Sequence, residues 1–206
     1  MARRSLVLIA VLAACVLGLL GCDDDDDAGA TSAGTYVGEV EGSDAYIALV
    51  TDGENVSGYL SDGTPKGVDV YYWIGASAVS DGSATLVARF GEPIVGEAEF
   101  ADDEVSGQVV LHDLGGKRVA FTAELASGEA GLYSAAARRA PGEHALAEAG
   151  WILAADGSQR GAVGFTIPNA PPRLRPVPLI DATTDIVPIH GVGTMSVSQI
   201  TDPFGI

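Results

Sequence analysis

The residues best suited to chemistry lie near the N-terminus, where a cysteine directly precedes five aspartates. Cys22 supplies a thiol, and Asp23–Asp27 supply five carboxylates. A calcium site needs six to eight oxygen ligands held in a defined geometry, and consecutive residues of like charge stay extended and solvated. Together with the small and polar residues 28–34 that follow, the acidic run predicts a linker, residues 22–34, rather than a metal site.

The residues before Cys22 indicate how the cysteine is used. Arg3 and Arg4 precede fifteen uncharged residues, Leu6–Leu20. This run is short for a membrane-spanning helix, which needs about 20 apolar residues, and is typical of a signal peptide. It ends in Leu-Leu-Gly-Cys at 19–22, which resembles the lipobox of bacterial lipoproteins. The resemblance implies that residues 1–21 are removed and that the Cys22 thiol receives diacylglycerol. An uncleaved anchor helix is the alternative.

Lipidation at Cys22 predicts where the chain resides. Two or three acyl chains anchor a protein stably, since each buried methylene contributes ~0.8 kcal/mol, so we expect an extracytoplasmic protein held on the cell membrane or outer membrane. Cys15 lies within the signal peptide, which leaves the mature chain without thiol chemistry. Loss of Arg3 and Arg4 takes the formal net charge from −17 to −19. This charge excludes nucleic acid as a partner and repels anionic headgroups.

None of the other motifs predicts a metal site or a catalytic site. A zinc site pairs its ligands on one element, whereas His112, His144 and His190 are single and far apart. Residues 52–63 have the length of an EF-hand loop, but Val56 and Ser57 stand where that loop needs an oxygen ligand and a glycine. The stretch HGVGTMS at 190–196 has no accompanying G-x-S-x-G elbow. No metal, cofactor or catalytic residue is predicted.

The aromatic run at 71–73 is the strongest candidate for binding. Strand alternation puts Tyr71 and Trp73 on one face, where they would offer an exposed platform to a sugar or peptide. Packing of Trp73 between two layers is the favoured alternative. Glu97, Glu99 and the acidic turn 102–104 hold carboxylates of the kind a glycosidase uses, but a solvated acidic rim explains them better.

Short alternating runs broken by glycine turns dominate residues 35–167. Eleven candidate strands, at about twelve residues per strand and turn, predict an all-β domain. Short links favour an antiparallel up-and-down meander that forms a barrel or sandwich of about ten strands. Residues 119, 121, 123 and 125 are expected to share a buried face. The one helical candidate is EHALAEA at 143–149.

The C-terminal residues 168–206 differ in composition, because seven of the ten prolines lie there. They predict an extended segment whose later apolar residues, between Ile186 and Ile200, favour partial docking on a sheet edge. Residues 35–165 also resemble an all-β module of bacterial secreted and lipid-anchored proteins, through the patterns Y-x-G-x-x-x-G at 36–42 and A-x-I-A-L-V-x-D-G at 45–53. That resemblance implies no catalytic or binding residue.

Three functions remain open on the sequence. The first is a lipid-anchored, non-catalytic envelope module, not an enzyme, that binds an as yet undefined protein, peptide or glycan. The second is a structural or accessory lipoprotein of a larger membrane assembly, which a sheet edge with a docking tail would favour. A hydrolase is third and requires a pair of carboxylates in a cleft. In every case the membrane partner acts through the lipid on Cys22.

Overall fold

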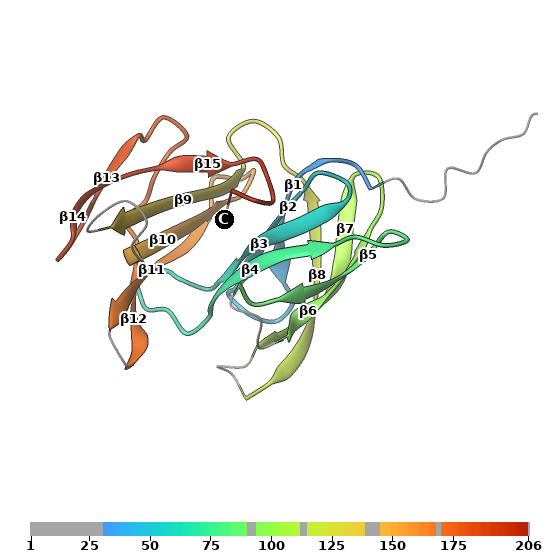
Figure 1. Ribbon diagram of the computed structural model, residues 1–206, viewed down its shortest axis with the longest axis horizontal. Coiled ribbons are helices and arrows are strands. Elements are labelled where there is room, and N and C mark those ends of the chain that lie inside the picture. Colours follow the sequence, from blue (N-terminus) through green and yellow to red (C-terminus); the bar gives the residue numbers. More distant parts are fainter. Residues whose placement is uncertain (1–30, 90–93, 112–114, 139–144, 168–169, 206) are drawn as a thin grey trace, which may run out of the picture.

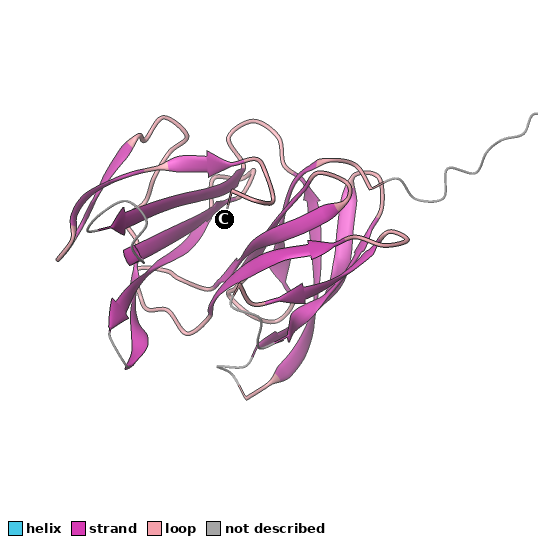
Figure 2. Ribbon diagram, viewed as in Figure 1, coloured by secondary structure: helices cyan, strands magenta, loops and turns pink. Residues whose placement is uncertain are grey.

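The computed structural model describes residues 31–89, 94–111, 115–138, 145–167 and 170–205. These residues form strands, turns and loops, and no helix occurs among them (Figure 2). The predicted all-β, antiparallel fold is therefore confirmed. Over the same ranges there is accordingly no helix of the length and apolarity needed to cross a membrane.

The first half of the chain forms an eight-stranded sheet that curls into a nearly closed barrel (Figure 1). The order β4-β3-β2-β1-β8-β7-β6-β5 joins two four-stranded meanders along β1 and β8. The two edges of this sheet, β4 and β5, approach each other on the opposite side of the barrel. There the Arg89 amide donates to the Trp73 carbonyl oxygen, 2.8 Å away, and Ile74 and Ala88 form an isolated antiparallel β-bridge. The strands are β1 (Gly34–Val40), β2 (Tyr46–Thr51), β3 (Asn55–Ser61), β4 (Tyr71–Ala78), β5 (Ser83–Val87), β6 (Ile94–Phe100), β7 (Glu104–Leu111) and β8 (Lys117–Leu125).

Alternation along the strands fills the barrel with apolar side chains. On β8, Phe121 and Ala123 are buried while Thr122 and Glu124 are exposed, as the period of two predicts. Leu125, expected to continue the buried face, is instead 38% exposed because β8 ends there at the barrel rim. The largest fully buried side chains of the barrel interior are Tyr36, Ile47, Leu49, Leu60, Ile74, Leu86, Leu111 and Phe121.

Glycine allows the barrel strands to approach one another closely. A Cβ atom on Gly38 of β1 would lie 1.9 Å from the Thr122 carbonyl oxygen of β8. A Cβ atom on Gly107 of β7 would lie 2.1 Å from the Glu97 carbonyl oxygen of β6. No side chain fits at these distances unless the backbones move apart. The tight curvature of the barrel therefore depends on residues that lack a side chain.

The residues after Leu125 form a second antiparallel sheet, of five strands in the order β12-β11-β10-β9-β15. Its strands are β9 (Gly131–Arg138), β10 (Ala145–Leu153), β11 (Gln159–Ile167), β12 (Ala170–Pro176) and β15 (Ser198–Ile200). The helix predicted over 143–149 is wrong for its described part, because β10 includes these residues. Ala147 and Ala149 are fully buried, and pairing with β9 and β11 outweighs the modest helix propensity of alanine and glutamate.

The C-terminal residues complete the second sheet and cover it. β12 pairs with β11 at one edge, and β15 pairs with β9 at the other. The hairpin of β13 (Ile186–Ile189) and β14 (Gly193–Ser196) buries Val187, Ile189 and Met195 in one cluster with Trp151. These residues supply four of the fifteen strands, which is why the strand number exceeds the ten or so expected from residues 35–167.

The second sheet packs on the outer face of barrel strands β2, β3 and β4. This interface cluster consists of Tyr46, Ala48, Val50, Tyr59 and Trp73 from the barrel with Leu132, Ile152 and Ile200 from the second sheet. The Gly161 amide also donates to the Gly63 carbonyl oxygen across the junction, 3.0 Å away. Every residue of β2 is consequently buried, which explains why its sequence is an almost unbroken apolar run rather than an alternating one.

Replacement of Gly38 tests the close approach of β1 and β8. The new methyl group of Gly38→Ala would overlap the Thr122 carbonyl oxygen, 1.9 Å away, so the free energy of unfolding should fall by about 1–3 kcal/mol or more. Urea unfolding followed by tryptophan fluorescence measures this loss. Thr85→Ala, at an exposed strand position, is the control and should cost no more than about 0.5 kcal/mol. Equal effects of the two substitutions would contradict the proposed packing.

Candidate functional site

The predicted binding residues Tyr71 and Trp73 lie at the interface between the barrel and the second sheet. Trp73 is only 6% exposed, and Tyr71 is half-buried. The Trp73 ring lies against Tyr59, with ring centroids 4.4 Å apart, and Tyr71 contacts Tyr59 edge to face at 5.6 Å. Trp73 is thus packed between two layers. An open aromatic platform at this position would require the two sheets to separate.

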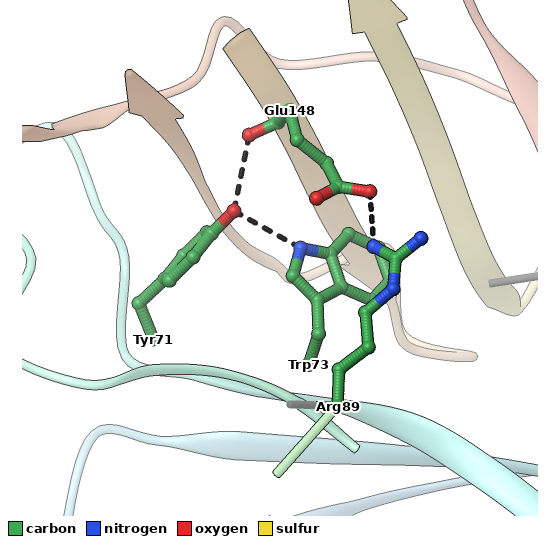
Figure 3. A network of polar contacts seen from close by, with 4 residues as sticks. All are labelled: Tyr71, Trp73, Arg89 and Glu148. Carbon is green, nitrogen blue, oxygen red and sulfur yellow. Dashed lines mark hydrogen bonds and ion pairs between the residues drawn. The ribbon is translucent and has the colours of Figure 1, made fainter. Parts of the chain in front are cut away.

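Polar contacts link these rings to the second sheet (Figure 3). The Trp73 indole Nε1 donates a hydrogen bond to the Tyr71 hydroxyl, 3.0 Å away, and that hydroxyl donates to the Glu148 carbonyl oxygen at 3.1 Å. The Arg89 guanidinium, just after β5, forms an ion pair with the Glu148 carboxylate on β10. Each polar group drawn here therefore has a partner, and the network connects β4, the end of β5 and β10.

Two glycines of the second sheet make room for the aromatic side chains. A Cβ atom on Gly150 would come within 2.8 Å of both Trp73 and Tyr59, and one on Gly164 would lie 2.9 Å from the Tyr71 hydroxyl. The rings therefore lie directly on the backbone of β10 and β11. Since a buried aromatic side chain removes 150–250 Å² from water, this contact is a large part of the adhesion between the sheets.

Burial of the tyrosines changes their acidity. The pKa of Tyr71 is raised well above its ordinary value, first by burial and second by the nearby Glu148 carboxylate. Burial also raises the pKa of Tyr59 strongly, with a further contribution from Tyr71. Both hydroxyls therefore stay protonated through the physiological range. The Tyr71 hydroxyl acts as a neutral hydrogen-bonding group, whereas the Tyr59 hydroxyl is buried without a hydrogen-bond partner among the described residues.

A cavity of about 240 Å³ lies beside this network. Its lining residues are Trp73, Arg89, Ser134, Ala135, Ala136, Glu148, Ile200 and Gly205. The charged groups in its wall neutralise each other, and Ser134 supplies the one hydroxyl of the lining. The cavity offers a ligand few unpaired polar groups, so its walls serve chiefly to join the two sheets.

A second concave region of about 410 Å³ lies where β1, β2 and β8 meet loops of the second sheet. Glu39, Glu124 and Asp156 line it together with apolar groups, among them Val37 and Leu125. The Tyr46 hydroxyl donates to the Glu39 carboxylate, 2.9 Å away. The three carboxylates are exposed to solvent, which fits the acidic character of the whole surface.

The remaining sequence candidates stay apart. Glu97 and Glu99 are exposed on the outer face of β6, and residues 102–104 lie at the turn into β7. Asp52 begins the β2–β3 turn, where its carboxylate accepts the amides of Glu54 and Asn55, and these hydrogen bonds lower its pKa. In the ranges that the structure describes, no three metal-ligating side chains converge.

Several predicted residues lie elsewhere. His190 is exposed at the turn between β13 and β14. Cys22, the aspartates 23–27, His112 and His144 lie outside the described residues. Arg89 and Glu148, which complete the polar network, were not predicted, because they are 59 positions apart in the chain. The only local signal was an arginine within the apolar stretch TLVARF of this acidic chain.

Neither a protein-family model nor a curated protein nor a solved structure matches this chain. The site is therefore interpreted from its own geometry and chemistry.

Alkaline titration tests whether the aromatic contact stabilises the fold. Because burial raises the folded-state pKa of Tyr59 and Tyr71, the unfolded chain releases protons above about pH 10 that the folded chain retains. Their contribution to stability is complete below that pH and is lost as the pH rises further. The free energy of unfolding should fall by up to about 1.4 kcal/mol per pH unit for each tyrosine.

The variant Tyr71→Phe separates this tyrosine from the others. It should flatten the alkaline fall, as measured by urea unfolding between about pH 8 and 11. At the lower pH it should also cost about 1–3 kcal/mol, because the Trp73 indole and the Glu148 carbonyl lose their partner. An alkaline slope equal to that of the unmodified chain would show that Tyr71 ionises freely in the folded protein.

Proposed function

We propose that this protein is a lipid-anchored, extracytoplasmic binding module of a bacterial envelope, without catalytic activity of its own. The observation that carries the proposal is the sequence Leu19-Leu20-Gly21-Cys22 at the end of an uncharged fifteen-residue run. The bond it predicts is a thioether from Cys22 to diacylglycerol, whose acyl chains insert into the bilayer. A folded β domain then follows on an acidic linker.

The way the chain enters the fold supports this arrangement. The Tyr36 hydroxyl donates to the Ser32 carbonyl oxygen, 2.9 Å away, so the residues just before β1 lie against the barrel. Gly34, the start of β1, lies twelve positions after Cys22, and a stretch of this length reaches at most about 40 Å. The barrel would thus lie close to the bilayer, while β12 and β13 lie at the other end of the molecule (Figure 1).

The charge of the mature chain disfavours direct contact between the domain and the membrane surface. The formal charge of −17 becomes −19 once the signal peptide is lost, and charge of this sign is repelled by anionic headgroups. The linker contributes five of the carboxylates. The covalent lipid would therefore supply the attachment and the protein surface would remain available to partners in the aqueous compartment.

Metabolic labelling tests the anchor. In cells given radiolabelled palmitate, the unmodified protein should incorporate the label, and Cys22→Ala should incorporate none, because the thiol that receives the lipid is gone. Cys22→Ala should also migrate as the heavier precursor, since cleavage follows lipidation. Both results are read from one gel of immunoprecipitated protein.

The chain contains its own matched control for this experiment. Cys15→Ala removes the other cysteine, seven residues earlier within the apolar run, and should leave both labelling and processing unchanged. Label that persists in Cys22→Ala, or that disappears in Cys15→Ala, would refute the assignment of Cys22 as the lipid attachment site.

A further inference from the structure

A third concave surface, which we call the distal groove, lies on the second sheet where the C-terminal residues fold over it. It has a volume of about 380 Å³, within the usual range of ligand sites. Its walls come from β11, the end of β12, the segment after β12, β13 and one barrel loop. The lining residues are Pro65, Val163, Phe165, Arg175, Pro176, Val177, Pro178, Leu179, Pro188, Ile189 and His190.

The charge of the distal groove is opposite to that of the chain. The protein has 28 acidic and 11 basic residues, yet among the residues that the structure describes no aspartate or glutamate lines this groove. Its polar groups are the guanidinium of Arg175 and the imidazole of His190, both on exposed residues. Arg175 lies over the Phe165 ring, 5.5 Å from its centroid, and forms no ion pair with any described carboxylate. A cationic group is thus presented at the rim without a counter-charge from the described part of the chain.

The apolar lining includes exposed residues, and prolines make part of it rigid. Leu179 is 72% exposed, a large fraction for a leucine that borders a groove. Four prolines line the groove, and proline has a fixed φ angle and little freedom to lose on binding. A partner would therefore bury apolar surface here with a small cost for ordering the groove.

We propose that the distal groove is the docking site for an extended, acidic segment of a partner protein that carries aliphatic side chains. This inference rests on the proposed function and specifies the partner of that binding module. The partner's aliphatic side chains would pack on Leu179, Phe165 and the prolines. A neighbouring carboxylate would accept paired hydrogen bonds from the Arg175 guanidinium, whose planar fork matches a carboxylate.

The position of the groove favours a protein segment over a lipid. The chain enters the fold at the barrel, whereas β12 and β13, which supply part of the groove, lie at the other end of the molecule (Figure 1). The lipids of the anchoring membrane would therefore lie nearer the barrel than the groove. A second copy of this chain is disfavoured by repulsion between two highly acidic proteins.

Recognition would depend on side chains rather than on addition of a strand. β12 is the sheet edge beside the groove, and it ends at Pro176, which has no amide hydrogen to donate to an added strand. An aliphatic and acidic peptide would instead lie across the groove between Arg175 and Leu179.

A peptide selection tests the proposal with the full mature, lipidated protein in nanodiscs of neutral lipid. A random linear peptide library displayed on phage is selected on the unmodified protein and, separately, on Arg175→Glu. Peptides that combine aliphatic residues with aspartate or glutamate should be enriched on the unmodified protein alone. A synthetic peptide from that pool should bind at least about tenfold more weakly to Arg175→Glu and to Leu179→Asp, and more weakly in high salt.

Arg118→Glu is the matched control, because it makes the same charge change at an exposed position on β8 of the barrel. It should bind the peptide like the unmodified protein. The proposal is overturned if no peptide is enriched, if Arg175→Glu enriches the same peptides, or if Arg118→Glu weakens binding equally. It is also overturned if Arg175→Glu and Leu179→Asp retain peptide binding but lose self-association or binding to anionic vesicles. Palmitate labelling should be unaffected by these variants, so failure of the peptide selection would leave the proposed lipid anchor at Cys22 intact.

Discussion

The structure depends on the burial of an aromatic barrel face against glycines of a second sheet. Strand β2 has apolar side chains on both faces, and β3 adds Tyr59 to the interface cluster, so the barrel is incomplete without the sheet formed by residues 131–200. Tyr59, Tyr71 and Trp73 fit only because Gly150 and Gly164 have no side chains. The same contact sets the environment of the polar network, since it removes Tyr71 from water and brings Glu148 beside Arg89.

The C-terminal residues have a structural role that their proline content conceals. They supply the two edge strands of the second sheet and the hairpin that covers its core, which buries Val187, Ile189 and Met195. Prolines suit such positions, because an edge strand need not donate hydrogen bonds outward and a rigid segment loses little entropy when it folds over a sheet. The distal groove is a consequence of this arrangement, since its walls are shared by the sheet and by the segment that crosses it.

Charge is distributed unevenly over a chain that is acidic overall. Carboxylates gather on the outer barrel face and on the groove near β1 and β8, where they are solvated. The exposed Arg173 and Arg175 lie on β12, at the other end of the molecule. A protein tethered through its N-terminal end, as proposed, would therefore have its acidic barrel nearer the membrane and the groove with Arg175 farther from it.

The sequence by itself determined the strand-rich, antiparallel architecture, because alternation of side chains and glycine turns are local patterns that act before any long-range contact forms. It also supports the prediction at Cys22, which depends on the residues Leu-Leu-Gly-Cys at 19–22 and on the uncharged run that they end. It did not reveal that Ala145–Ala149 form a strand, because helix propensity is weak and burial on both sides of β10 decided the outcome. Only the tertiary structure decided which face of the aromatic run is covered, that Arg89 meets Glu148, and that prolines from three segments form one groove. These features join residues tens of positions apart. The spacing of residues along the chain predicts pairing of neighbouring strands, but it does not indicate which face of one sheet packs against another.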